Sequence, residues 1–177
     1  MPISKRTTSV HAQLVEYETH LPPTETNARL DRALNRAEAG KLLPLLASAQ
    51  NKDDIVRDLT ALIGESGFIY FSALPHHNWL NKYFEKPAEE QFPATTIYTL
   101  GNPLIAQTIL KHDLHAGLGI PPRLLVLGTP GGGTKILYHL PSSIMVPDAK
   151  ASEELYSALV ALDERLERFV ETVLEEN

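Results

Sequence analysis

Hydrophobic and polar residues follow two different periods along this chain, and together they predict strands and helices in alternation. Residues 8–17 alternate between apolar and polar side chains, which is typical of a strand with one buried face. Residues 68–74 form a continuous apolar and aromatic run, which favours a strand covered on both faces. Residues 95–100, 123–128 and 134–140 are also strand-like, and a glycine-rich hairpin turn joins the last two.

Apolar residues at helical spacing, with capping residues before them, predict the helices. Asn51 opens a capping arrangement, and Glu153 and Glu154 suit the first turn of the last helix. That last helix is the clearest, because six large apolar residues recur along one side of it. Helices are predicted between residues 24 and 40, 42 and 49, 51 and 64, 76 and 84, 104 and 111, and 152 and 174.

The order of these elements predicts a single α/β (α+β) domain over residues 1–177. They follow one another as β-α-β-(α)-β-α-β-β-α, which calls for one mixed β-sheet with helices packed on it. A chain of 177 residues is long enough to bury a core without disulfide or metal support. It has no cysteine, so thiolate metal sites, iron–sulfur clusters and cysteine nucleophiles are excluded.

The charge balance and the hydropathy of the chain argue against nucleic acid and membranes as binding partners. The chain has 16 basic and 22 acidic residues, and it lacks a basic stripe with interleaved aromatic residues. No apolar run reaches the ~20 residues of a membrane span, and the N-terminus has no apolar segment of a secretory signal. We therefore expect a cytoplasmic protein that binds neither nucleic acid nor membrane.

The glycine-rich segment 128–135 is interpreted as a hairpin turn and not as a phosphate-binding loop. A P-loop places its lysine directly before a serine or threonine, whereas Thr134 precedes Lys135 here. The residues that follow are strand-like, so no helix N-terminus faces an anion.

Polar residues gather after two of the predicted strands. Gly101 and Asn102 end one strand, where Asn102 can cap the following helix or contact a ligand. His76 follows another strand, and an imidazole there can act as a general base, a proton donor or a metal ligand. The sequence therefore predicts a polar pocket near the strand ends at His76 and Asn102.

Four histidines are weak candidates for a metal site. His76 and His77 are adjacent, whereas His112 and His115 are spaced to share a helix face, with Asp113 beside them. No specific metal signature such as HExxH is present, so surface or capping histidines are the alternative. The sequence identifies no cofactor.

Over roughly residues 51–175 the chain resembles the "domain of unknown function 302" family of small α/β proteins. The resemblance rests on a strand that opens with Gly-Phe and is followed by histidine, a Gly-Asn-Pro turn, an acidic residue, an entry like LP-x-R and an end like Y-x-x-P. These motifs correspond here to Gly67, Phe68, His76, Gly101, Asn102, Pro103, Asp113, Pro121, Arg123, Tyr138 and Pro141. The spacing from Gly101 to Arg123 needs no gap, which makes the resemblance specific.

The resemblance implies a compact sheet domain that forms a homodimer, and it implies no established activity. Where the family has an aspartate before the histidine, this chain has Pro75, so an Asp–His dyad is missing or rebuilt from elsewhere. Residues 22–50 are interpreted as a helical insertion relative to the family. Such an insertion can cap a pocket, extend a dimer interface or only add to the fold.

Three functions stay open. The first is a homodimeric binding module for a small polar or aromatic ligand. Its candidate ligand contacts are Asn102, Gly101, Asp113, Arg123 and Tyr138. The second is a small enzyme that uses His76 as general acid or base, and the third is a histidine-ligated metal or haem protein. We prefer the binding module, because no carboxylate adjoins His76 in the sequence and the histidine spacing is unspecific.

Overall fold

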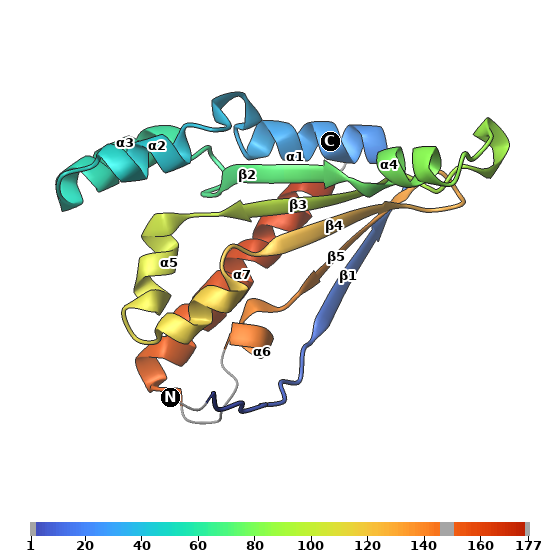
Figure 1. Ribbon diagram of the computed structural model, residues 1–177. Coiled ribbons are helices and arrows are strands. Elements are labelled where there is room, and N and C mark those ends of the chain that lie inside the picture. The colour runs from blue at the N-terminus through green and yellow to red at the C-terminus, as the bar shows by residue number, and fades with distance from the viewer. Residues whose placement is uncertain (1–2, 146–150, 176–177) are drawn as a thin grey trace.

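The computed structural model describes residues 3–145 and 151–175, which are built around one five-stranded sheet (Figure 1). The strand order in the sheet is β1-β5-β4-β3-β2, and all four neighbouring pairs are antiparallel. The strands are β1 (Leu14–Thr19), β2 (Ile69–Pro75), β3 (Thr95–Gly101), β4 (Arg123–Gly128) and β5 (Thr134–His139).

Seven α-helices and three short 3₁₀ turns connect or flank the strands in the described residues. The Asn51 and Ser152 side chains cap α3 and α7 by accepting hydrogen bonds from backbone amides, and the Asn51 cap is the one predicted from the sequence. None of the helices in the described segments is long and apolar enough to cross a membrane. The helices are α1 (Pro23–Ala33), α2 (Leu42–Ser48), α3 (Lys52–Leu62), α4 (His76–Tyr83), α5 (Pro103–Leu110), α6 (Pro141–Met145) and α7 (Glu153–Leu174).

The fold class predicted from the sequence is confirmed, with one correction: the sheet is antiparallel throughout and not mixed. Strands β2, β3, β4 and β5 are neighbours both in the sequence and in the sheet, so the chain reverses direction at each step. β1 then joins the free side of β5, again antiparallel. A parallel pair needs a crossover that returns the chain to the same end of the sheet, and none of the connections between these neighbours is one.

Two strands differ from the sequence pattern, β1 in its extent and β2 in how much of it is buried. β1 begins at Leu14 and not at residue 8, because Leu14 pairs with His139 at the end of β5 and earlier residues have no strand beside them. β2 is covered on both faces only at its start. Ile69 and Tyr70 are buried there, but Leu74 is exposed.

The main core lies between one face of the sheet and helices α1 and α7. Tyr98, Leu124 and Ile136 point inward from the sheet, and Leu159 and Leu166 meet them from α7. Burying each such leucine or isoleucine contributes about 1.5–3 kcal/mol. The fold is therefore held by the alternating inward residues of the strands and by the apolar side of α7.

Segment 22–50 contributes two of its helices to buried clusters. Leu30 and Leu34 of the α1 region are fully buried in the main core. Leu42 of α2 belongs to a second, smaller cluster with Leu59 of α3 and Ile69 of β2. α1 is thus an integral part of the layer that covers the sheet.

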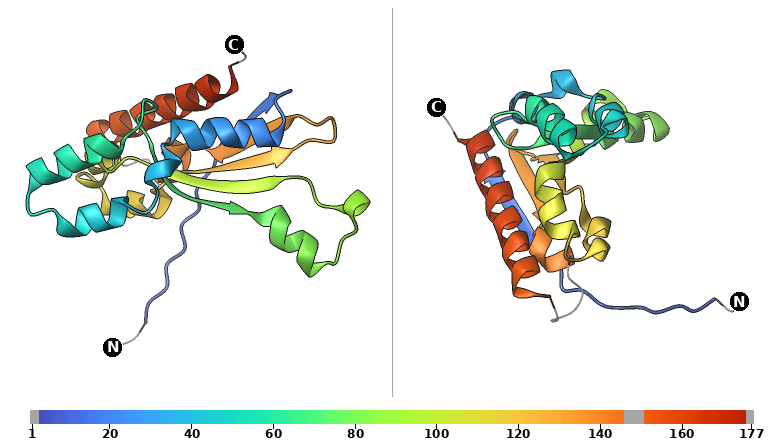
Figure 2. Two further views of the ribbon diagram at one scale, coloured as in Figure 1. Left: turned by 90° about the horizontal axis from the view of Figure 1, so that it is seen from above. Right: turned by 90° about the vertical axis from the view of Figure 1, so that its left-hand side faces the viewer.

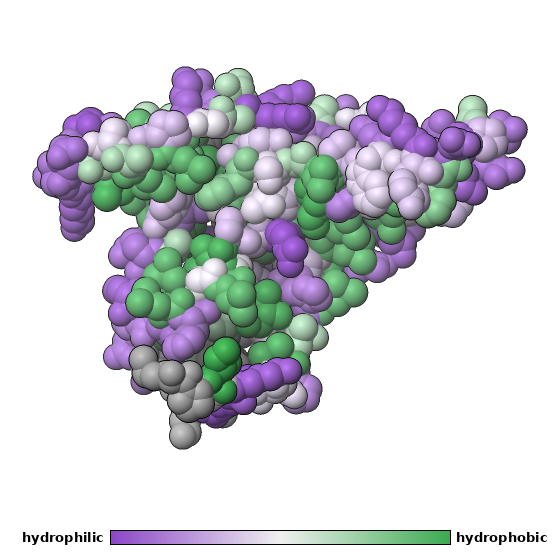
Figure 3. All heavy atoms as spheres, viewed as in Figure 1, coloured by the Kyte–Doolittle hydropathy of each residue, from purple (hydrophilic) through white to green (hydrophobic). Residues whose placement is uncertain are grey.

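The other side of the sheet is called the open face here. It is defined by Leu74, Ile97, Leu125 and Leu137 and by every second residue before and after them on each strand, because these side chains point to the same side. α7 runs along the opposite face of the sheet (Figure 2). Figure 3 shows hydrophobic residues exposed across the middle of the molecule in the view of Figure 1.

Candidate functional site

His76 and Asn102 lie at opposite ends of the β2–β3 pair, which corrects the pocket predicted between them. Gly101, just before Asn102, pairs with Ile69 at the start of β2. Pro75, just before His76, pairs with Thr96 near the start of β3. Seven residues of strand separate the two ends, roughly 20 Å. The prediction assumed that β2 and β3 finish at the same end of the sheet, as parallel strands do. Because the two strands are antiparallel, they finish at opposite ends.

The Asn102 side chain connects the end of β3 to the start of α5 and to the loop before β2. Its Oδ1 accepts a hydrogen bond of 2.8 Å from the amide of Leu104 and so caps α5, and its Nδ2 donates one of 2.8 Å to the carbonyl of Gly67. The cavity beside it is about 20 Å³ and mostly apolar, room for about one water molecule. The side-chain amide is therefore engaged with the protein itself.

Gly101 lies where the strand passes close to two neighbouring side chains. A Cβ at this position would lie 3.2 Å from the Cβ of Pro121 and 3.3 Å from the ring of Phe71. The strand thus passes tightly between its neighbours just before the Asn102 cap. Both members of the Gly-Asn pair have structural roles that are sufficient to explain them.

The two histidines at the start of α4 face different partners. His76 Nδ1 accepts a hydrogen bond of 3.3 Å from the indole Nε1 of Trp79. His77 Nδ1 lies 3.0 Å from the amide nitrogen of Thr95 and 3.1 Å from its carbonyl oxygen, so it joins α4 to β3. No carboxylate of the described residues forms an ion pair with His76, so the group that would orient it as a base is not beside it.

The other histidine pair and Asp113 form a turn. Asp113 Oδ1 accepts a hydrogen bond of 2.8 Å from the amide of His115 and lies 2.8 Å from its Nδ1. These contacts lower the pKa of Asp113, and the hydrogen bond from the His115 amide has the largest effect. The His115 side chain is 90% exposed. Across residues 3–145 and 151–175, no three His, Cys, Asp or Glu side chains gather so that they could hold a metal ion.

Arg123 and Tyr138 are on opposite sides of the sheet. Arg123 is exposed on the open face, whereas Tyr138 of β5 is buried against α7. The Tyr138 hydroxyl has no hydrogen-bond partner among the described residues. Burial is the main cause that raises the pKa of Tyr138, and the nearby Tyr17 is the second cause. The candidate ligand contacts from the sequence are therefore spread over several separate places.

A buried carboxylate that the sequence did not single out lies near Tyr138. Asp163 of α7 is buried, and its Oδ1 accepts a hydrogen bond of 2.9 Å from the Ser142 amide at the start of α6. Burial raises the pKa of Asp163, and the charges of Glu167 and Glu164 add to the rise. On the sequence Asp163 is one more acidic residue of an amphipathic helix, so no pattern marked it.

Replacing Asp163 by asparagine is expected to stabilise the protein more at pH 8 than at pH 3. A carboxyl whose pKa is raised by folding stabilises the protein below its unfolded pKa, and this contribution is lost as the pH rises through the folded value. Asparagine keeps an acceptor for the Ser142 amide but does not ionise. Urea unfolding of Asp163→Asn and wild type between pH 3 and pH 8 measures the difference. Glu171→Gln, at an exposed position of the same helix, is the control, and an equal effect of Asp163→Asn at every pH contradicts the prediction.

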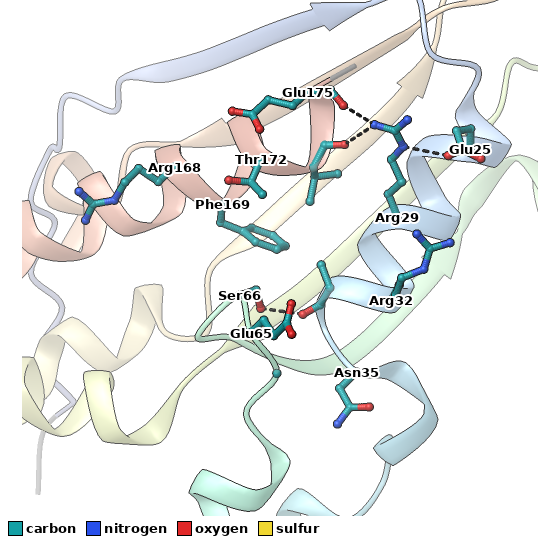
Figure 4. Close-up of a pocket in the computed structure, with 13 residues that line it drawn as sticks. Glu25, Arg29, Arg32, Asn35, Glu65, Ser66, Arg168, Phe169, Thr172 and Glu175 are labelled. Atoms are coloured by element: carbon teal, nitrogen blue, oxygen red, sulfur yellow. Dashed lines mark hydrogen bonds and ion pairs between the residues drawn. The ribbon is translucent and has the colours of Figure 1, made fainter. Parts of the chain in front are cut away.

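A groove of about 950 Å³ lies on the helical side of the molecule, between α1, the loop 64–66 and the C-terminal part of α7 (Figure 4). Arg29 closes one end of it. Its Nε lies 2.8 Å from Glu25 Oε1, and its Nη1 donates to the carbonyl oxygens of Val173 and Glu175 at 3.3 and 2.6 Å. The groove is lined by Glu25, Arg29, Arg32, Ala33, Asn35, Gly64, Glu65, Ser66, Arg168, Phe169, Thr172, Val173 and Glu175.

Two further arginines border the groove from different helices. Arg32 of α1 and Arg168 of α7 are exposed, and neither forms an ion pair with a residue of the described segments. The buried ring of Phe169 lies between the helices, and the Ser66 hydroxyl donates a hydrogen bond of 2.7 Å to the Ala33 carbonyl. No pattern in the sequence indicated this site, because its residues come from three distant segments and most of them resemble solvent-exposed helix residues.

One five-stranded antiparallel sheet with helices packed on it defines the chain as an α+β domain. The chain belongs to the family described as "Domain of unknown function DUF302", whose model matches residues 46–173. This confirms the resemblance seen in the sequence. No curated protein matches.

A solved structure is similar in fold over nearly the whole chain. It is described as a crystal structure of an uncharacterized conserved protein DUF302 from Bacillus stearothermophilus. The similarity covers 92% of this chain and 98% of that chain, with a TM-score of 0.61 and 17% sequence identity. At this level of identity the likeness extends to the fold.

Proposed function

We propose that this protein is a binding module for a small ligand that carries one anionic group and an apolar part. The ligand would lie in the groove between α1 and α7. The observation that carries the proposal is the pair Arg32 and Arg168, which border the groove from two sides without an ion-pair partner among the described residues. A volume of about 950 Å³ is in the range of small-molecule sites.

The chemistry of the lining supports one anionic group and disfavours a polyanion. A guanidinium recognises a carboxylate or phosphate through paired hydrogen bonds. Arg29 is already engaged by Glu25 and two carbonyls, so Arg32 and Arg168 are the arginines left for a ligand. Glu65 and Glu175 also line the groove and would repel additional negative charge. Phe169 and Val173 offer apolar surface for the rest of the ligand.

This proposal keeps the binding module predicted from the sequence but moves the ligand away from His76 and Asn102. The small enzyme with His76 as acid or base stays a prediction. Within residues 3–145 and 151–175, the hydrogen-bond partner of the His76 ring is the Trp79 indole, which is not a carboxylate. The histidine-ligated metal or haem protein also stays a prediction. The homodimer implied by the family resemblance is likewise a prediction.

The proposal is tested with phenyl phosphate as the probe, because it combines one phosphate with one apolar ring. Isothermal titration calorimetry is expected to detect binding to the wild type. Arg168→Gln and Arg32→Gln are each expected to weaken it about tenfold, since each removes one charged hydrogen-bond donor, worth about 1.4 kcal/mol. Phenol, which lacks the anion, is expected to bind more weakly than phenyl phosphate.

The matched control is Arg165→Gln, which removes the same charge from an exposed position of α7 outside the groove. It is expected to leave the affinity for phenyl phosphate unchanged. Absence of binding at millimolar phenyl phosphate would overturn the proposal. Equal losses in Arg165→Gln and Arg168→Gln would overturn it as well, because they would indicate attraction to the general charge of the surface.

A further inference from the structure

β1 forms one edge of the sheet, and among the described residues no strand lies on its outer side (Figure 1). Its odd-numbered residues turn their N–H and C=O groups toward β5, in line with the hydrogen bond from the Leu140 amide to the Gln13 carbonyl just before the strand. Its even-numbered residues therefore turn theirs away from the sheet, and no loop or helix of the described segments bonds to them. This row of unpaired donors and acceptors is called the free edge of β1 here, and it belongs to Leu14, Glu16 and Glu18.

Carboxylates flank the free edge on the helical side of the sheet. Tyr17 of β1 points to this side, and its hydroxyl donates a hydrogen bond of 3.4 Å to Glu167 Oε1 of α7. Burial raises the pKa of Tyr17, and the charges of Glu167 and Glu171, about one helical turn apart, add to the rise. Neither glutamate forms an ion pair with a residue of the described segments. This side of the edge is therefore negatively charged.

Carboxylates also flank the free edge on the open face. Glu16 and Glu18 point to this side, because Glu16 pairs with Leu137 of β5 and the two glutamates are two residues apart. Lys135 of β5 lies 2.6 Å from the Glu16 carboxylate and 3.6 Å from that of Glu18. One lysine thus faces two glutamates, so the open face of the edge also keeps a negative charge.

A buried polar group beside Tyr17 lacks a partner as well. The ring of Tyr138 stacks on that of Tyr17 with 6.5 Å between their centroids, and Tyr138 is only 3% exposed. Its hydroxyl forms no hydrogen bond with the described residues, and the buried Asp163 carboxyl lies near it. Oxygen atoms that can accept hydrogen bonds thus outnumber donors where β1 meets α7, and this imbalance favours a cationic donor from outside.

We propose that the free edge of β1 binds an extended peptide segment of another protein, with lysine or arginine at every second position. The peptide adds an antiparallel strand to the sheet through main-chain hydrogen bonds, and its basic side chains lie on the helical side. Alternate residues of a strand are roughly 7 Å apart, and residues four apart on a helix are about 6 Å apart along its axis. Two basic side chains can therefore meet Glu167 and Glu171 together.

The charge of the free edge favours such a peptide over a second copy of this chain. Pairing of two β1 strands would bring Glu16 and Glu18 of one copy against the same carboxylates of the other, and like charges directly opposite destabilise a strand pair. The inference goes beyond the proposed groove. That groove is lined by other residues of α7, among them Arg168 and Thr172, so the two proposals stand or fall separately.

Fluorescence anisotropy tests the proposal with the full chain and a fluorescein-labelled peptide of alternating lysine and threonine. This peptide is expected to bind, and to bind more weakly as salt is added. In the proposed pairing its threonines lie on the open face, and their N–H groups point to β1. A peptide with proline in place of threonine keeps the charge but loses these N–H groups, so it is expected to bind at least about tenfold more weakly. A peptide of alternating glutamate and threonine is expected not to bind.

Variants of the chain locate the binding site. Glu167→Gln and Glu171→Gln are each expected to weaken binding of the lysine–threonine peptide about tenfold, as the loss of one charged hydrogen bond does. Glu153→Gln is the matched control, because Glu153 is exposed at the start of the same helix, and it is expected to leave the affinity unchanged.

A pair of substitutions at one position tests the main-chain hydrogen bonds. Glu16→Gln and Glu16→Pro remove the same charge, but proline also removes an N–H group of the free edge. This N–H group points away from β5, so proline is compatible with the edge strand. Glu16→Pro is expected to bind the peptide about fivefold more weakly than Glu16→Gln.

Several results would overturn the proposal. One is no rise in anisotropy at protein concentrations of about one millimolar. Another is equal affinity for the threonine and proline peptides, or equal losses in Glu153→Gln and Glu167→Gln, because either would indicate attraction to the general charge of the surface. Sedimentation velocity supplies the last: a dimeric wild type that Glu16→Pro converts to a monomer would show that a second copy occupies the edge.

Discussion

Replacing Gly133 by alanine is expected to destabilise the protein by about 3 kcal/mol, as an overpacked and strained backbone position does. A Cβ at Gly133 would collide with the carbonyl oxygen of Thr19, which belongs to the neighbouring strand β1. That oxygen is part of the backbone and cannot rotate away as a flexible side chain could. To relieve the collision, the end of β1 has to move away from β5.

Urea unfolding followed by circular dichroism measures this loss. Gly131→Ala is the matched control from the same hairpin turn, because a Cβ at Gly131 meets no described atom within 4 Å. The control is expected to change the free energy of unfolding by less than about 0.5 kcal/mol. Equal stabilities of the Gly133→Ala and Gly131→Ala variants would show that β1 does not approach the turn this closely.

Replacing Asn102 by alanine is expected to cost about 2–3 kcal/mol of stability. The loss of a helix cap accounts for about 1 kcal/mol, and the Gly67 carbonyl, whose partner is removed, accounts for another 1–2 kcal/mol. Both losses follow from the two hydrogen bonds of 2.8 Å that the side chain makes. Thermal and urea unfolding of the purified variant give the measured value.

Asn102→Ser separates the two contributions. A serine hydroxyl can accept from the Leu104 amide, so the cap of α5 survives, but the shorter side chain leaves the Gly67 carbonyl without its donor. We expect this variant to lie between wild type and Asn102→Ala. An Asn102→Ala variant as stable as wild type would be the contrary result, and it would reopen a ligand-binding role for this amide.

Much of the fold could be predicted from the sequence because its signals are local. The apolar stripe of α7 and the cap at Asn51 are each recognisable within a few helical turns of sequence. The direction of the strands is not local information. Whether β3 runs parallel or antiparallel to β2 depends on whether the connection of residues 76–94 carries the chain back to the end of the sheet where β2 began, and no residue pattern within it decides that.

The candidate site was harder to predict for the same reason. Gly101 and Asn102 were rightly recognised as a strand end with a helix cap, but their distance from His76 follows from strand direction. The groove joins Arg29 and Arg32 of α1 to Arg168 of α7, more than a hundred residues along the chain. Each arginine by itself looks like a solvated helix residue, so only the packing of α1 beside α7 brings the site together.

The pairing of β1 with β5 has a consequence for synthesis. Leu14 and His139 are partners, so after Leu14 the ribosome must add 125 more residues (139 − 14), up to His139, before the sheet can close. At about 5–20 residues per second this takes on the order of ten seconds. During that time the residues of β1 have already been synthesised, but β5, the strand with which they pair, has not. Glu16 and Glu18 then have a protective use, since charged side chains on an unpaired strand discourage its association with other nascent chains.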